Sequence, residues 1–231
     1  MAHSQQQTFV ASIARDFPQA FRNARVLEIG SLDINGSVRR HFVGCDYVGV
    51  DLGEGPGVDV IAEGQTYDAP DASFDTVVSC ETMEHNPYWR ETFENMIRLC
   101  RPGGLVMMTC GSTLRAEHGT RRTTPEFAPL IPWEYYRNLT ARDFQRVIPI
   151  RRHFSSSIFC RELTSHDLYF AGFKAGAPPP PRAASVLGRL RRSYLLDNAR
   201  NWRAVRAHLL IRIMGEERYM AGPVLQRFRR R

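Results

Sequence analysis

Two carboxylates and an imidazole lie close together in the segment CETMEH. Glu81, Glu84 and His85 are spaced i, i+3 and i+4. A helix that begins directly after a strand at this point would place all three side chains on one face. Carboxylate oxygens suit Mg²⁺ or Mn²⁺, and an imidazole nitrogen admits Zn²⁺ or Fe²⁺. The spacing therefore predicts a site for a divalent cation.

A second group combines a glycine turn with a later acid. The run VLEIGSLDINGS is typical of a strand that ends in a turn at Gly30, and the next strand, VGVD, ends in Asp51. In an open α/β sheet this arrangement places the turn against a cofactor and the carboxylate near a ribose diol. This turn is a poor binding site for a pyrophosphate, because the next glycine, Gly36, comes only after Asp33. A nucleoside-type cofactor is therefore expected.

These residues need alternating strands and helices to position them. Short apolar runs bounded by Gly, Asp or Pro predict buried strands at 24–30, 46–51, 58–62, 74–79, 104–109, 153–160 and 167–173. Helical patterns predict helices at 4–21, 87–100 and 140–148, the last capped by Thr140. We expect an α/β fold, a Rossmann-like three-layer α/β/α sandwich with a mostly parallel seven-stranded sheet. In such a sheet the ligand site lies beyond the carboxyl ends of the strands.

The segment 111–139 has no clean period and is rich in Pro, Thr and aromatic residues, which predicts a long loop over the site. Five of its side chains can bind an anionic or sugar substrate through charged hydrogen bonds and ring stacking. The alternative is that they only hold the loop in place. These side chains are Arg121, Arg122, Tyr135, Tyr136 and Arg137.

In order along the chain, LEIGS, VGVDL, SFDTVVSCETMEH and LCRPGGLVMMTCGS resemble the motifs of class I S-adenosylmethionine-dependent methyltransferases of type 11, over about residues 24–112. The resemblance implies S-adenosylmethionine as the cofactor. It also implies cofactor contacts from Glu28, Gly30 and Ser31 to the amino-acid end, Asp51 and Leu52 to the ribose, Glu63 and Gly64 to the adenine, and Cys80 beside the sulfonium. The family's usual D-x-G-x-G-x-G reads E-I-G-S-L-D-I-N-G here, so contacts beyond Ser31 stay open.

The E-x-x-E-H pattern resembles the metal site of the small-RNA 2′-O-methyltransferases and the ubiquinone-pathway O-methyltransferases. In the RNA group a later histidine completes the metal shell, which implies His118 as a ligand beside Glu81, Glu84 and His85. A hydroxyl must be polarised or deprotonated before it attacks a sulfonium methyl. We assign the base role to His85 or His118, or to a metal-bound substrate alkoxide if both bind the metal. Metal-free relatives also carry a Glu–His pair here, which caps a helix or orients the substrate.

The function predicted from these features is S-adenosylmethionine-dependent O-methylation, assisted by Mg²⁺, Mn²⁺ or Zn²⁺. The expected acceptor is a hydroxyl of a sugar, a glycan or another small diol-like substrate. Three alternatives stay open: an RNA 2′-O-methyltransferase, a membrane-associated quinone-pathway O-methyltransferase, and a non-catalytic cofactor-binding module.

Composition changes along the chain predict its domain organisation. We expect a methyltransferase domain over 1–175, a Pro-rich linker over 176–182 and a basic helical tail over 183–231. Residues 182–231 hold 13 Arg against 3 acids. The apolar spacing from Trp202 to Ile213 predicts an amphipathic helix. We expect it to pack on its own domain or to form a homodimer with a twin subunit, in preference to binding nucleic acid or an anionic membrane surface.

The composition excludes several classes of protein. With 43% hydrophobic and 24% charged residues, the 231-residue chain can bury a core, unlike disordered or collagen-like sequences. Its five cysteines form no C-x-x-C pair, so neither a disulfide framework nor a zinc ribbon is indicated. No secretory signal or membrane span is recognisable, and we therefore expect a cytoplasmic protein.

Overall fold

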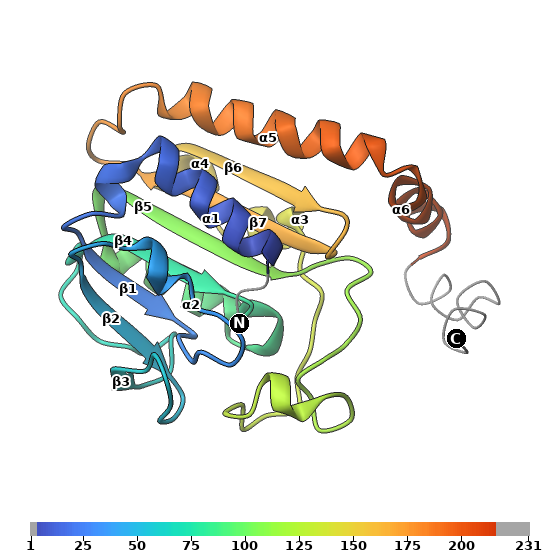
Figure 1. The fold of residues 1–231 in the computed structure, drawn as a ribbon, viewed down its shortest axis with the longest axis horizontal. Coiled ribbons are helices and arrows are strands. Elements are labelled where there is room, and N and C mark those ends of the chain that lie inside the picture. The colour runs from blue at the N-terminus through green and yellow to red at the C-terminus, as the bar shows by residue number, and fades with distance from the viewer. Residues whose placement is uncertain (1–3, 216–231) are drawn as a thin grey trace.

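A single seven-stranded sheet forms the centre of the computed structural model, which describes residues 4–215 (Figure 1). Its strands are β1 (Arg25–Ile29), β2 (Asp46–Asp51), β3 (Val60–Ile61), β4 (Phe74–Cys80), β5 (Cys100–Gly111), β6 (Phe154–Glu162) and β7 (Asp167–Lys174). Their order across the sheet is β3-β2-β1-β4-β5-β7-β6. The prediction of a Rossmann-like α/β fold with seven strands is confirmed.

The sheet is mixed, so the prediction of a mostly parallel sheet is wrong. Pairings from β3 to β5 are parallel, whereas β7 runs antiparallel to both β5 and β6. Residues 163–166 are all that join β6 to β7. A parallel pairing needs a crossover connection of a dozen or more residues, so this short turn forces the antiparallel arrangement.

Helices cover both faces of the sheet (Figure 1). They are α1 (Ser4–Asp16), α2 (Trp89–Leu99), α3 (Ala141–Val147), α4 (Ile150–His153), α5 (Ala183–Arg200) and α6 (Trp202–Met214). Short 3-10 turns occur at Pro18–Ala20, Val38–His41, Met83–His85 and Pro125–Phe127. The helix set is modest, since among the described residues only a 3-10 turn lies between β1 and β2. The first helix is shorter than predicted because Pro18 disfavours helical backbone at the preceding residue.

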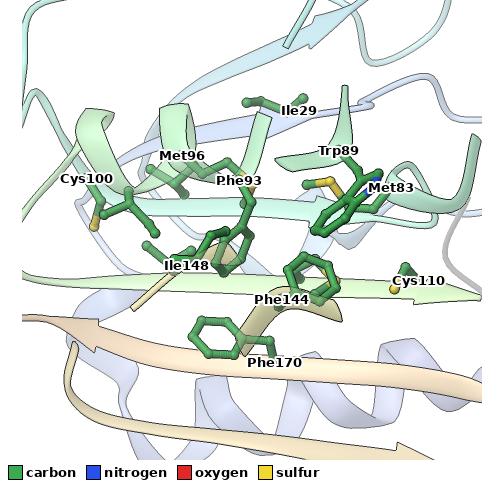
Figure 2. Packing of buried hydrophobic residues seen from close by; sticks show 14 of the residues in the cluster. Ile29, Met83, Trp89, Phe93, Met96, Cys100, Cys110, Phe144, Ile148 and Phe170 are labelled. Carbon is green, nitrogen blue, oxygen red and sulfur yellow. The ribbon is translucent and has the colours of Figure 1, made fainter. Parts of the chain in front are cut away.

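Helices α2 and α3 bury aromatic side chains against one face of the sheet. Phe93 of α2 lies 5.2 Å from Phe144 of α3 and 5.3 Å from Phe170 of β7, measured between ring centroids. Figure 2 shows these rings meeting between the helices and the strands, with Trp89 beside Phe144. The expected cap of α3 is present, because the Thr140 N–H donates to the Asp143 carboxylate at 2.8 Å. Met83, in the segment that follows β4, is buried in the same cluster.

Helices α1 and α5 cover the opposite face. Phe9 and Ile13 of α1 and Leu187 of α5 are buried there with side chains of β4, β5 and β7. Helix α5 runs along β6, and α6 follows it at the end of the described chain (Figure 1). The basic run at 227–231 lies outside the described residues. Within residues 4–215 every helix is too short or too polar to reach across a lipid bilayer.

Glu28 points into this second core, away from solvent. Its Oε2 accepts a hydrogen bond from the Tyr47 hydroxyl at 2.7 Å. Burial raises the pKa of the Glu28 carboxyl to about 7, and the bond from Tyr47 opposes part of that rise. Between the ordinary pKa of a glutamate side chain and about pH 7, the folded chain therefore holds a proton on Glu28 that the unfolded chain releases.

We expect Glu28 to make stability fall as pH rises from 5 to 8. The stabilisation from Glu28 is fully present below the pKa that its carboxyl has in the unfolded chain. It is lost as the pH rises through the folded-state pKa of about 7. Relative to Glu28→Gln, which stays neutral, the wild type should lose roughly 3 kcal/mol of unfolding free energy across this interval. Urea denaturation at several pH values measures the difference. The exposed Glu63→Gln variant serves as control, and parallel pH curves for wild type and Glu28→Gln would contradict the assignment.

Candidate active site

A cleft opens at the carboxyl ends of β1, β2 and β4. Its walls include the apolar side chains of Ile29 in β1, Val50 in β2 and Ala62 directly after β3. Its other side is formed by residues 127–133 of the loop that follows β5. The prediction that segment 111–139 forms a loop over the site is confirmed, since only one 3-10 turn interrupts it between β5 and α3.

Gly30 makes the tight turn at the end of β1. Its φ of 79° lies in the left-handed region, and a Cβ atom at this position would overlap the Thr82 hydroxyl. The N–H groups of Gly30 and Ser31 both donate to the Val50 carbonyl, at 2.9 and 3.2 Å. The turn is thus fastened to β2 and packed on the segment after β4. Thr82 is a partner of this turn that the sequence did not reveal.

Asp51 is held rigidly on the cleft wall. Its Oδ2 accepts from the Leu32 N–H and its Oδ1 from the Leu52 N–H, both at 2.8 Å. A carboxylate oxygen has capacity for a further hydrogen bond, so both oxygens stay able to accept from a diol. The backbone fixes the orientation of the carboxylate before any ligand binds.

The eight predicted cofactor residues divide into two sets. Gly30, Asp51, Leu52 and Gly64 line the cleft. Among the described residues, Glu28, Ser31, Glu63 and Cys80 do not line it.

Strand alternation explains part of this division. Glu28 and Cys80 point to the face covered by α1, because side chains two apart in a strand share a face and their neighbours take the other. Ser31 is buried beneath the turn, packed against Gly49. Glu63 is exposed and accepts a hydrogen bond from Gln65 at 2.8 Å.

Three potential metal ligands meet beside the cleft. One ligand atom each from Glu84, His85 and His118 lies within 4.8 Å of the other two. The Glu84 Oε1 accepts from the Gly111 N–H at 2.8 Å, and the His118 Nδ1 lies 3.0 Å from the Ala116 carbonyl. The Glu84 Oε2 and the His85 Nδ1 are buried without a hydrogen-bond partner among the described residues. Such atoms have the chemistry of a cation site.

Glu81 lies apart from this group. Its φ of 52° is left-handed, its Oε1 is 3.4 Å from the Thr109 hydroxyl and its Oε2 is 3.8 Å from an Arg115 nitrogen. The expected helical face for Glu81, Glu84 and His85 does not form, since only a 3-10 turn follows β4 and α2 begins at Trp89. Pro87 disfavours helical backbone at the residue before it, which delays the helix.

The electrostatic state of the group follows from burial. Burial lowers the pKa of His85 to about 4, so its imidazole is neutral at physiological pH. A neutral imidazole can accept a proton from a hydroxyl or give its lone pair to a cation. Burial and the nearby Glu84 carboxylate raise the pKa of Glu81. Arg115 is the cation that faces Glu81, and it also lies 3.9 Å from Asp167 of β7.

The five loop side chains that we considered for substrate binding take different positions. Arg122 pairs with Glu117 and Glu134, and Arg137 pairs with Asp143 at 2.9 Å, so these arginines hold the loop.

The Tyr136 ring lies 5.4 Å from the His85 ring and 5.1 Å from the His118 ring. Arg121 is exposed, and Tyr135 is partly buried. Among described residues none of the five lines the cleft.

Sequence reasoning missed the residues with which the loop lines the cleft. Phe127, Leu130 and Trp133 do so, and large apolar residues in an otherwise polar loop are the signal that could have identified them. The Trp133 indole N–H also donates to the His85 carbonyl. Arg115 and Asp167 carried no such signal, because their meeting depends on the long-range pairing of β5 with β7.

Comparison with known proteins gives a family and a fold. The profile of a family described as a methyltransferase domain matches residues 1–147. No protein of curated function matches the sequence significantly. Among solved structures, the CurJ carbon methyltransferase is 13% identical with a TM-score of 0.51, and the match covers 74% of this chain and 54% of that one. This chain thus spans about half of the CurJ chain.

Two further solved structures match this chain. The [4+2]-cyclase SpnF is 10% identical with a TM-score of 0.53, and the match covers 77% of this chain and 84% of that one. A Burkholderia thailandensis 1,6-didemethyltoxoflavin-N1-methyltransferase is 17% identical with a TM-score of 0.48 over 76% and 92% of the two chains. Because the family profile matches well over half of the sequence, the chain belongs to the methyltransferase-domain family.

Proposed function

We propose that the protein is an S-adenosylmethionine-dependent O-methyltransferase, assisted by a divalent cation, that acts on a hydroxyl of a sugar, a glycan or another small diol-like substrate. One observation carries the proposal. His85 belongs both to the cleft wall and to the group of three potential ligands with Glu84 and His118. A cation held there would lie where the cleft meets the loop, beside the place where the acceptor must reach the methyl group.

The donor set suits a borderline divalent cation. Glu84 offers one oxygen, and His85 and His118 offer one nitrogen each. With Glu81 outside the group, this set favours Mn²⁺ or Zn²⁺ over Mg²⁺, which prefers oxygen ligands. A cation bound there would polarise an acceptor hydroxyl and make it easier to deprotonate. Two neighbouring hydroxyls of a diol can reach one cation together, which supports the diol-like class of acceptor.

The cleft fits the cofactor of the family. Ile29, Val50 and Ala62 offer an apolar wall to a flat base, and Asp51 offers two fixed oxygens to a ribose diol. S-adenosylmethionine, when bound, supplies a methyl group on a sulfonium: an O–C bond forms, the C–S bond breaks and its electron pair stays on sulfur. Gly30 and Leu52 bound the same wall.

The acceptor's proton has two routes. With His85 and His118 both bound to a cation, the hydroxyl would be polarised by that cation and would release its proton to solvent before it attacks. Without a cation, the neutral imidazole of His85 can accept the proton. Phe127 and Trp133 stand on the cleft side of His85 and limit the access of water. Methyl transfer from a sulfonium is favourable once the hydroxyl lies in line with the carbon, so positioning is most of the work.

The metal group is tested by titration of Mn²⁺ and Zn²⁺ into the full chain, followed by calorimetry. We expect one site that Glu84→Gln and His118→Ala weaken by at least about tenfold, because each removes a ligand. Glu81→Gln should keep the affinity, since Glu81 lies apart from the three ligands, and it serves as the matched control. Chelator should also abolish methyl transfer in the wild type. Full activity in chelator, or loss of metal binding only in Glu81→Gln, contradicts the proposal.

Cofactor binding is tested at the ribose position. Asp51→Ala removes two charge-assisted hydrogen bonds, each worth about 1.5–3 kcal/mol, so the affinity for S-adenosylmethionine should fall at least about 100-fold. Asp46→Ala is the control, because Asp46 lies on the same strand, exposed and paired with Arg25 at 3.2 Å. Calorimetric titration measures both variants. Unchanged affinity in Asp51→Ala would remove the ribose assignment.

The acceptor class is tested with a panel of hydroxyl compounds and radiolabelled S-adenosylmethionine. We expect methyl transfer to glycosides that carry neighbouring hydroxyls, and weaker transfer to the matched deoxy-glycosides that lack one of the pair. Mass spectrometry locates the new methyl group. Transfer restricted to an oligoribonucleotide supports the RNA alternative, and transfer restricted to a catechol supports the quinone-pathway alternative. Methylation of nitrogen or carbon acceptors alone contradicts O-methylation.

A further inference from the structure

Helix α6 is apolar on two sides, but its own chain covers only one of them. Ala204 and Ile211 are buried against the body of the protein. Large apolar side chains on the other side are exposed: Trp202 (62%), Leu209 (56%) and Ile213 (73%). They follow helical spacing, so they share one face. Large apolar side chains that are exposed together mark a candidate contact surface.

Positive charge lies beside the outer face of α6, because Arg203 and Arg206 are exposed on the same helix. Two further arginines, Arg189 and Arg192, are exposed on the preceding helix α5. Within residues 4–215, none of these four arginines has a carboxylate at ion-pair distance. Arg200, by contrast, pairs with Asp197 at 3.2 Å.

A groove next to α6 carries the same sign of charge. It runs between β6 and the two tail helices, and Val205 and His208 of α6 line it. Exposed arginines from α4, β6 and α5 line it as well, and no Asp or Glu does so among the residues that the structure describes. These arginines are Arg151, Arg152, Arg161 and Arg191. The groove therefore adds positive charge on the side of α6 that carries Val205 and His208.

The positive charge around α6 favours an anionic partner over a second copy of the chain. A second copy would bring one arginine-rich face against another, and like charges across an interface oppose association. An anionic lipid surface would accept the apolar side chains among its acyl chains and pair its headgroups with the flanking arginines. Trp202 begins the helix, and tryptophan favours the boundary between headgroups and hydrocarbon. Figure 1 shows α6 at one end of the molecule, beyond the edge strand β6.

We propose that α6 binds anionic membrane surfaces, with Trp202, Leu209 and Ile213 inserted at the interface and Arg203 and Arg206 contacting lipid phosphates. This inference does not depend on the acceptor or on the metal. It concerns where the enzyme works, and its test measures binding without measuring methyl transfer.

The test is flotation of the full chain with two kinds of vesicle. One kind contains phosphatidylglycerol and phosphatidylcholine in roughly equal parts, and the other contains phosphatidylcholine alone. We expect binding to the anionic vesicles that salt weakens, and little binding to the neutral ones. The double variant Leu209→Asp, Ile213→Asp should bind at least about tenfold more weakly. The double variant Arg203→Glu, Arg206→Glu should also bind at least about tenfold more weakly, because each arginine near an anionic surface raises the affinity about fivefold.

Two controls separate this result from misfolding and from general stickiness. Val43→Asp changes an equally exposed apolar residue (59%) at another place on the surface and should leave vesicle binding unchanged. Circular dichroism should show the wild-type melting curve for every variant. The blue shift of tryptophan emission on vesicle binding should largely disappear in Trp202→Phe.

Several outcomes would overturn the proposal. They are equal binding to both kinds of vesicle, no binding to either, or full binding by the double aspartate variant. Sedimentation of the wild type as a dimer that the same variant dissociates would assign the face to a second copy. Binding of a polyuridine RNA that competes with vesicles and survives the aspartate substitutions would assign the charge to nucleic acid.

Discussion

The hydrogen bonds between the Met83–His85 turn and the loop after β5 are the interaction on which the rest of the site depends. The Glu84 carbonyl accepts from the Arg137 N–H at 2.8 Å, and its carboxylate accepts from the Gly111 N–H at 2.8 Å. The Trp133 indole donates to the His85 carbonyl. These bonds fasten a loop with little regular structure to one short turn at both of its ends. Together with the ion pairs of Arg122 and Arg137, these bonds hold the loop side of the cleft in place.

The distribution of buried charge supports Glu84 as the cation ligand in place of Glu81. Burying a carboxylate is costly unless a cation or several donors compensate it. Arg115 lies 3.8 Å from Glu81 and 3.9 Å from Asp167, so one guanidinium serves both. Among described residues no lysine or arginine lies within ion-pair distance of Glu84. A bound cation would supply the missing charge, and the two imidazoles beside it would complete its ligands.

The parts of this structure that follow local rules could be predicted from the sequence, and the parts that depend on pairing could not. The strands that end at Asp51 and Cys80 follow from short apolar runs with clear boundaries. The turn at Gly30 follows from its glycine. The face to which Glu28 points depends on how the strands lie between the two helical layers, which a motif match does not report.

The helical face assumed for Glu81 does not form for a more local reason. Its spacing from Glu84 suits a helix, but Pro87 lies two residues after His85 and keeps this segment from continuing as one. His118 lies beside Glu84 and His85, as the family resemblance implied, although its loop has no periodicity; its role as a ligand stays a prediction. The spacing of residues therefore predicts a shared face only where the assumed helix forms.

The fold does not by itself determine the reaction, since CurJ is a carbon methyltransferase and SpnF a [4+2]-cyclase on similar folds. Chemistry must come from side chains at the carboxyl edge of the sheet. In this chain the loop after β5 closes one side of that edge: a Cβ atom on Gly119 would come within 2.8 Å of the His85 ring. The backbone therefore lies directly against the imidazole there. In the proposed reaction an acceptor reaches His85 through the cleft that Phe127 and Trp133 also line, so these two side chains bear on the choice of acceptor.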